Sequence, residues 1–113
     1  MGISVGSVVI NCEDIDTMSE FWATALDLTP GPITEGGRFR VLGGERVNLS
    51  LQVAQSPIVC RNEIHLDLYT DDAAAQVQRL VGLGATVVRH NADPRDTYTV
   101  MKDPEGNAFC VCS

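Results

Sequence analysis

The stretch Ile64-His65-Leu66-Asp67-Leu68-Tyr69-Thr70-Asp71-Asp72 decides the fold, because it joins an alternating strand to the start of a helix. One face of the strand is wholly apolar and should pack on the helix, and the other face carries His65, Asp67 and Tyr69. Apolar residues at positions 73, 74, 77, 80 and 81 then recur with helical spacing. Gly84 is placed to end this helix.

The same pattern occurs 58 residues earlier, where Ser7 stands in place of His65. Asp14 is a good N-cap for a helix with apolar residues at 18, 21, 22, 25 and 26. Three shorter strand candidates follow each helix. They are a weak one around Leu28, then 38–42 and 47–53 in the first half, and 85–89, 97–101 and 108–112 in the second. The order strand-helix-strand-strand-strand therefore occurs twice, which indicates an internal duplication.

Turns are predicted where Pro, Gly and Asp gather, at 29–32, 35–37, 43–44, 92–94 and 103–107, and residues 54–62 are predicted to be a linker. We therefore expect a single domain, 1–113, made of two halves at about 1–54 and 62–113. The expected fold class is α+β, with paired βαβββ units that form curved mixed sheets. One unit leaves a sheet face open, so the halves should pair within the chain or across a dimer. Open sheet edges favour a homodimer.

The sheet face away from the helices is predicted to form a concave ligand pocket, because small, polar and aromatic side chains mix on it. The residues expected to line it are Ser7, Asn11, Ser50, Gln52, His65, Asp67, Tyr69, Met101 and Cys110, with Arg38 or Arg40 and Tyr98 at its rim. His65 is the expected polar anchor, because a neutral imidazole both donates and accepts hydrogen bonds.

Fifteen acidic residues against eight basic ones give a net charge of -7. Such a surface disfavours nucleic acid and anionic membranes, because both are bound through Lys and Arg. No apolar run approaches the roughly 20 residues of a membrane span, and residues 1–5 lack the pattern of a secretory signal. The four cysteines show no CxxC spacing. We therefore expect a reduced, cytoplasmic protein.

With these features the chain resembles the vicinal oxygen chelate superfamily of glyoxalases, extradiol dioxygenases and bleomycin-resistance proteins. The stretches that carry the resemblance are Asp14-Ile15-Asp16 with Phe21-Trp22, His65-Leu66-Asp67-Leu68 with Asp71-Asp72, Leu83-Gly84-Ala85, and Asp103-Pro104-Glu105-Gly106-Asn107. The last stretch, with Phe109-Cys110-Val111, is most similar to the actinobacterial glyoxalase-like subgroup. The resemblance implies the glyoxalase/bleomycin resistance fold.

The resemblance also implies where metal-dependent members hold their ion, on the first and last strands of each half. The matching positions here are Ser7, Gln52, His65 and Cys110. Only His65 is a strong ligand, and no carboxylate is present to hold a hard divalent cation. We therefore expect no cofactor. If a divalent metal is bound, His65, Cys110 and Gln52 are its expected ligands, with Asp67 as partial compensation.

Three functional hypotheses follow. The first is a metal-free protein that binds a small organic ligand, as bleomycin-resistance-like members do, although an aromatic content of 5% argues against a large planar antibiotic. The second is a metal-dependent lyase, isomerase or dioxygenase of the glyoxalase type. The third is a metal-free enzyme with His65 and Asp67 as catalytic acid–base residues. Alternatively, Asp67 only orients His65, or pairs with Arg38 or Arg40.

Overall fold

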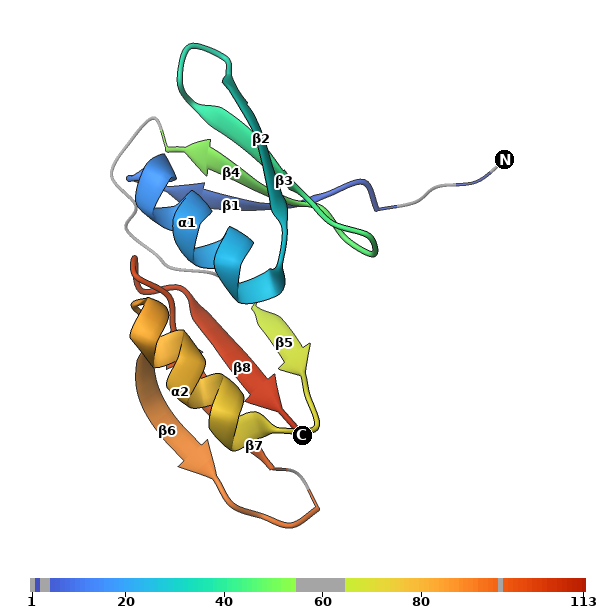
Figure 1. Cartoon of the computed structure of the whole chain (residues 1–113), viewed down its shortest axis with the longest axis vertical. Helices are drawn as coiled ribbons and strands as arrows, with labels where there is room; N and C mark the ends of the chain where they lie inside the picture. The colour runs from blue at the N-terminus through green and yellow to red at the C-terminus, as the bar shows by residue number, and fades with distance from the viewer. Residues whose placement is uncertain (1, 3–4, 55–64, 96) are drawn as a thin grey trace. The chain divides into compact units, whose positions relative to one another are not determined.

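The computed structural model describes residues 2, 5–54, 65–95 and 97–113. The chain divides into two compact units, Met1–Ile58 and Val59–Ser113 (Figure 1). The first unit contains β1 (Val8–Cys12), α1 (Ile15–Leu26), β2 (Thr29–Thr34), β3 (Phe39–Gly43) and β4 (Leu49–Val53). The second contains β5 (Leu66–Tyr69), α2 (Ala73–Leu83), β6 (Thr86–Asn91), β7 (Tyr98–Lys102) and β8 (Ala108–Cys112). The predicted α+β class and the repeated βαβββ order are confirmed.

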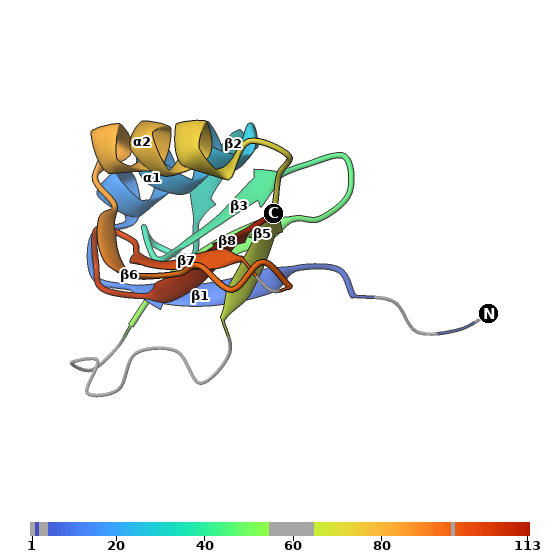
Figure 2. The same cartoon turned by 90° about the horizontal axis from the view of Figure 1, so that it is seen from below.

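Each unit has one four-stranded mixed sheet. The strand order is β1-β4-β3-β2 in the first unit and β5-β8-β7-β6 in the second. The first and last strands of each unit pair in parallel, and the other pairs are antiparallel. The helix covers one sheet face in each unit, and Figure 2 shows α2 on one side of β7 and β8. The first and last strands therefore present their remaining side chains together on the face away from the helix.

Helix α1 begins where its expected N-cap, Asp14, predicts, whereas α2 begins after Asp72, two residues later than the start expected after Thr70. The Asp14 carboxylate accepts the backbone N–H groups of Asp16 and Thr17, each at 3.1 Å. The backbone N–H of Thr17, and then its hydroxyl, lower the pKa of Asp14 below its ordinary value. Asp72 caps α2 through the N–H of Ala75 at 3.2 Å. Gly84 ends α2 with a φ of 118°, a conformation that favours glycine.

Apolar side chains between helix and sheet form the core of each unit. In the first unit the buried set is Cys12, Ile15, Met18, Phe21, Trp22, Ala25, Leu42, Leu49 and Leu51. In the second it is Leu80, Ala85, Met101, Phe109 and Val111. The predicted stripe on α2 is partly wrong, because Val81 is 47% exposed and Ala74 is also exposed. Apolar residues cover a wide arc of this helix, and the buried side follows 73, 76, 77, 80 and 83.

Strand β2 corrects the predicted turn at 29–32. These residues, Thr29-Pro30-Gly31-Pro32, belong to a strand that pairs with β3. Because β2 is at the edge of its sheet, the missing N–H groups of Pro30 and Pro32 interrupt no second ladder. The pairing register of β2 with β3 shifts between Pro30 and Ile33, so the irregular residues between them fit within the strand pair.

The predicted turn at 35–37 is confirmed by positive φ angles at Glu35, Gly36 and Gly37. Residues 55–64, which hold most of the predicted linker and Ile64, lie outside the described residues. The described helices, α1 and α2, lack the length and apolarity needed to cross a membrane.

Candidate functional site

The sheet face of the second unit that α2 leaves open carries the chemistry-bearing side chains. In the register, Asp67 lies opposite Cys110 and Tyr69 opposite Cys112, whereas Leu66 lies opposite the buried Phe109. The prediction that Leu66 and Leu68 face the helix while Asp67 and Tyr69 face away is therefore confirmed. His65, which directly precedes β5, contacts Asp67 on the same face.

His65, Asp67 and Cys110 form a compact cluster on this face. His65 Nε2 lies 3.2 Å from Asp67 Oδ1, and the two side chains are 56% and 45% exposed. The imidazole nitrogen, the carboxylate oxygen and the thiol sulfur all lie within 4.8 Å of one another. Tyr69, one pleat further along β5, is 81% exposed. The cluster is thus open to solvent while its Cys110 member is half-buried.

The thiol of Cys110 is held in its protonated form. Burial raises its pKa above the ordinary value, and the negative charge of Asp67 raises it further. The guanidinium of Arg89 acts in the opposite direction, and a hydrogen bond with Asp67 again raises the pKa. A thiolate is the nucleophilic form of cysteine, so this environment gives a weakly nucleophilic thiol at neutral pH.

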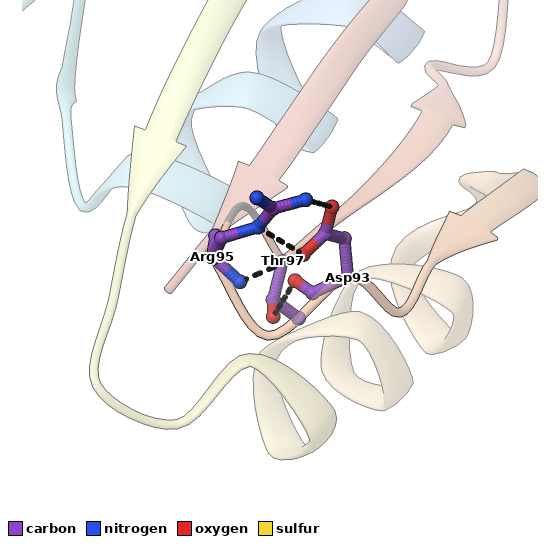
Figure 3. A network of polar contacts seen from close by, with 3 residues as sticks. All are labelled: Asp93, Arg95 and Thr97. Atoms are coloured by element: carbon purple, nitrogen blue, oxygen red, sulfur yellow. Dashed lines mark hydrogen bonds and ion pairs between the residues drawn. The ribbon is translucent and has the colours of Figure 1, made fainter.

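Tyr98 lies on the same face, opposite Cys112 in the register. The guanidinium carbon of Arg89 is 5.6 Å from the centre of its ring, and Arg89 Nη1 lies 3.5 Å from its hydroxyl. The loop that leads into β7 is held by a polar network (Figure 3), in which the Asp93 carboxylate accepts the backbone N–H of Arg95 at 3.0 Å. The hydroxyl of Thr97 donates to the Asp93 carbonyl at 3.0 Å. This network helps to position the start of β7 and therefore Tyr98.

The open face of the first unit is neutral. The hydroxyl oxygens of Ser7 and Ser50 lie 2.6 Å apart, and Ser7 donates to the Asn48 carbonyl at 3.1 Å. Either hydroxyl can donate the hydrogen of the serine–serine bond. Ser50 is 1% exposed, and Asn11 and Gln52 lie opposite each other and are exposed.

The register of the two units corrects one expected metal position. Ser7 lies two residues before Val9, which is opposite Ser50, just as His65 lies two residues before Asp67, which is opposite Cys110. The first-unit counterpart of Cys110 is therefore Ser50 and not Gln52. Gln52 lies one pleat further along, beside Asn11.

Three residues expected at the pocket do not lie on the open faces. Met101 is fully buried opposite Phe109, so it belongs to the core beneath α2. Arg40 lies opposite the buried Leu51 on the helix side, where its Nε donates to the Gly31 carbonyl at 2.7 Å and its side chain lines a groove of about 560 Å³ beside α1. Arg38 lies in the turn before β3, outside the strand, and is exposed.

The sequence prediction also missed residues. Phe39 and Val41 lie opposite Gln52 and Ser50, so they share the open face of the first unit. Val9 and Val41 are 48% and 38% exposed there. The alternation of Leu42 with Val41 was the available signal, because a buried Leu42 forces Val41 and Phe39 to the opposite face.

The four positions implied for a metal do not fit a hard divalent ion. They supply one imidazole, one thiol, the Ser7 hydroxyl, which already bonds Ser50 and Asn48, and either the amide of Gln52 or, by the register, the hydroxyl of Ser50. None is a carboxylate, and hard cations require oxygen ligands with charge. Asp67, which was expected as partial compensation, places its carboxylate oxygen 3.2 Å from His65 Nε2.

The sequence model described as Glyoxalase-like domain matches residues 7–112. Among curated proteins, none matches the chain. A glyoxalase/bleomycin resistance protein/dioxygenase family enzyme from Burkholderia phytofirmans PsJN is similar with a TM-score of 0.78 and 20% identity, over 95% of each chain.

Two further structures share the fold. Lactoylglutathione lyase from Agrobacterium tumefaciens has a TM-score of 0.70 and 19% identity, over 96% of this chain and 92% of its own. A variant of the fosfomycin resistance protein FosX from Listeria monocytogenes has a TM-score of 0.79 and 10% identity, over 99% of this chain and 90% of its own. It was solved with Mn(II) and 1S,2S-dihydroxypropylphosphonic acid. At these identities the similarity shows the fold alone.

Proposed function

Because the chain belongs to the glyoxalase-like domain family, we propose that it binds a small organic ligand on the open sheet face of its second unit. We propose that it binds this ligand without a full metal site, as bleomycin-resistance-like members do. The single observation that carries this proposal is the exposed His65–Asp67 pair, at 3.2 Å, beside the half-buried Cys110. We also propose that the chain belongs to the actinobacterial glyoxalase-like subgroup, which its stretch Phe109-Cys110-Val111 resembles.

The pair gives the imidazole a defined role. A carboxylate oxygen accepts hydrogen bonds only, so its contact with Nε2 favours the tautomer with a proton on Nε2. Nδ1 is then the acceptor for a hydroxyl or amine of the ligand. Tyr69, which is 81% exposed, offers an aromatic face to the ligand's apolar part.

A binding experiment tests this proposal. The probes are bleomycin, fosfomycin and S-lactoylglutathione, measured by thermal shift and calorimetry with a chelator present. His65→Ala should weaken the binding of the recognised probe roughly 5- to 150-fold, which corresponds to about 1–3 kcal/mol for an unsatisfied buried partner. His90→Ala is the matched control, because His90 Nδ1 instead lies 2.8 Å from the hydroxyl of Thr99, on the other side of the sheet. Equal losses in both variants, or no loss with His65→Ala, would contradict the proposal.

A second candidate is a metal-free enzyme in which His65 exchanges a proton with the substrate and Asp67 holds the imidazole. The direct contact between the two side chains favours it. Turnover of a bound probe by the chelator-treated protein, lost in both His65→Ala and Asp67→Asn, would support the enzyme. Binding without turnover supports the binding protein. The metal-dependent lyase, isomerase or dioxygenase is disfavoured by the poor fit of the four positions.

We further propose a cytoplasmic homodimer that does not bind nucleic acid. The net charge of -7 repels phosphate backbones. Strands β1 and β2 are the edge strands of one sheet, and β5 and β6 are the edge strands of the other. In β6, the side chains of Val87 and Val88 are 49% and 50% exposed. A second copy of the chain that covers such an edge strand buries its apolar side chains, which favours a dimer.

A further inference from the structure

A groove of about 560 Å³ lies beside α1, on the helix side of the first sheet. Its residues from the helix, at positions 16, 19, 20, 23, 24 and 27, share one helix face because they are three or four residues apart. Leu28 and Pro30 continue this wall, and Arg40 of β3 lines the groove as well. All of these residues belong to the first unit, so the groove is complete without the second unit.

Ser19 is the residue of this groove whose own contacts are incomplete. It is 3% exposed, and its hydroxyl has no hydrogen-bond partner among the described residues. A buried hydroxyl without a partner costs stability, so its presence needs an explanation. Ser19 lines the groove together with the exposed Asp16 and Glu20, and because it is buried it forms part of the groove's floor. A ligand in the groove can supply the missing hydrogen bond.

Charges of both signs line the groove without pairing. Asp16, Glu20 and Asp27 are exposed, and Arg40 is half-buried. The Nε of Arg40 donates to the Gly31 carbonyl at 2.7 Å, which holds the guanidinium beside the edge strand β2. Within the described part of the chain, none of these three carboxylates forms an ion pair with Arg40. A ligand that carries both charges can therefore be bound by both kinds of group at once.

We propose that this groove binds a cationic amino acid of the lysine type. The ligand's carboxylate accepts N–H groups of the Arg40 guanidinium, whose planar fork suits a carboxylate. Its α-ammonium donates to the Ser19 hydroxyl beside the carboxylate of Glu20, and its side-chain ammonium pairs with Asp27. Because three carboxylates face one guanidinium, a ligand with two cations and one anion complements the groove better than a zwitterion with one of each.

The spacing along the helix requires a chain between the two ammonium groups. Glu20 and Asp27 are seven residues apart in the sequence, which is roughly 10 Å along the helix axis. A single ammonium group cannot reach both carboxylates, whereas the roughly four-carbon stem of lysine separates its two cations. Ala23, Leu28 and Pro30 line the groove and offer apolar contacts to this stem.

Calorimetric titration of the full-length protein with lysine and three analogues tests the proposal. Cadaverine lacks the carboxylate of lysine, ε-aminocaproate lacks the α-ammonium, and norleucine lacks the side-chain ammonium. We expect one equivalent of lysine to bind, and we expect each analogue to bind at least roughly 5-fold more weakly, because each loses one charged contact.

Two substitutions test the contacts themselves, with urea unfolding to confirm that each variant is folded. Arg40→Gln should weaken lysine binding roughly 10-fold but should not weaken cadaverine binding, because cadaverine has no carboxylate. Arg38→Gln is the matched control, because Arg38 is exposed and does not line the groove. Ser19→Ala should weaken lysine binding by a similar factor and leave ε-aminocaproate binding unchanged. This variant loses only a hydroxyl without a described partner, so it should be at least as stable as wild type.

The proposal is overturned if lysine does not bind at millimolar concentration, or if cadaverine binds as tightly as lysine. It is also overturned if the two arginine variants lose the same affinity, or if Ser19→Ala binds lysine as tightly as wild type does. The probes of the proposed function are expected to contact the second unit, whereas lysine is expected to contact the first. A failed lysine titration therefore leaves the proposed function standing, and failed binding of those probes leaves the lysine site standing.

Discussion

Replacing Asp103 by alanine should cause a large loss of stability, because its buried carboxylate accepts the hydrogen bonds that hold the turn between β7 and β8. Its Oδ1 accepts the backbone N–H groups of Glu105 and Asn107, both at 2.9 Å. Its Oδ2 accepts the side-chain N–H of Asn107 at 2.8 Å. Asp103 is 3% exposed and Asn107 is 7% exposed, so water does not replace these bonds.

The magnitude follows from the two buried donors of Asn107. Each buried N–H left without a partner costs about 1–3 kcal/mol, so Asp103→Ala should lower the free energy of unfolding by about 2–6 kcal/mol. The turn joins β7 to β8, and β8 carries Cys110 opposite Asp67. Any folded Asp103→Ala protein should therefore also lose part of the alignment of the cluster.

Urea unfolding, followed by circular dichroism, measures the loss. Asp93→Ala is the matched control, because Asp93 also accepts a backbone N–H and a guanidinium from a residue two positions ahead (Figure 3). Its side chain and that of Arg95 are 40% and 89% exposed, so water can replace these bonds and stability should change little. A loss below 1 kcal/mol for Asp103→Ala, or equal losses for both variants, would refute the reasoning.

Three further outcomes are expected. Ser19→Ala should raise the free energy of unfolding by about 1 kcal/mol in the same assay. The reasons are that Ser19 is 3% exposed, that its hydroxyl has no partner among the described residues, and that alanine is the better helix former. A destabilised variant would show that the hydroxyl has a partner. Asp67→Asn should shift the pH profile of Cys110 alkylation by iodoacetamide to lower pH, measured by mass spectrometry with a chelator present. The reason is that the Asp67 charge adds to burial in raising the pKa of this thiol, and an unchanged profile would remove Asp67 as a cause. Light scattering should give a mass twice that of the 12.2 kDa chain at micromolar concentration, and a monomer would contradict the proposed dimer.

Strands with one apolar face were predictable, and strands with two mixed faces were not. In β5 the leucines alternate with charged and polar residues, so the side chains of Leu66 and Asp67 could be assigned to opposite faces. In β7 both faces carry apolar and polar groups, since Tyr98 and Val100 alternate with Thr99 and Met101. Only the pairing of Met101 with the buried Phe109 decides the face. Met101 was assigned to the wrong face because its pairing with Phe109 cannot be read from the residues of β7 themselves.

The error at Arg40 has a different cause. An arginine was expected to point away from the helix, but Arg40 lies on the helix side and its Nε bonds the Gly31 carbonyl of the edge strand β2. A long side chain can cover apolar surface with its stem while its head reaches a polar partner. That partner depends on β2, whose two prolines predicted a turn. Because β2 was predicted to be a turn, the predicted position of Arg40 was wrong as well.

The two units share one backbone pattern but divide the chemistry between them. In the first unit the Ser7 and Ser50 hydroxyls satisfy each other and the Asn48 carbonyl, so this position needs no ligand or ion to complete it. In the second unit the equivalent residues His65 and Cys110 are joined by Asp67, where the first unit has Val9. The exchange of valine for aspartate adds the one charge that can orient an imidazole or balance a cation. The charged contacts of any ligand bound to the open faces should therefore be concentrated on the second unit, because the open face of the first unit carries the uncharged Val9, Asn11, Val41 and Gln52.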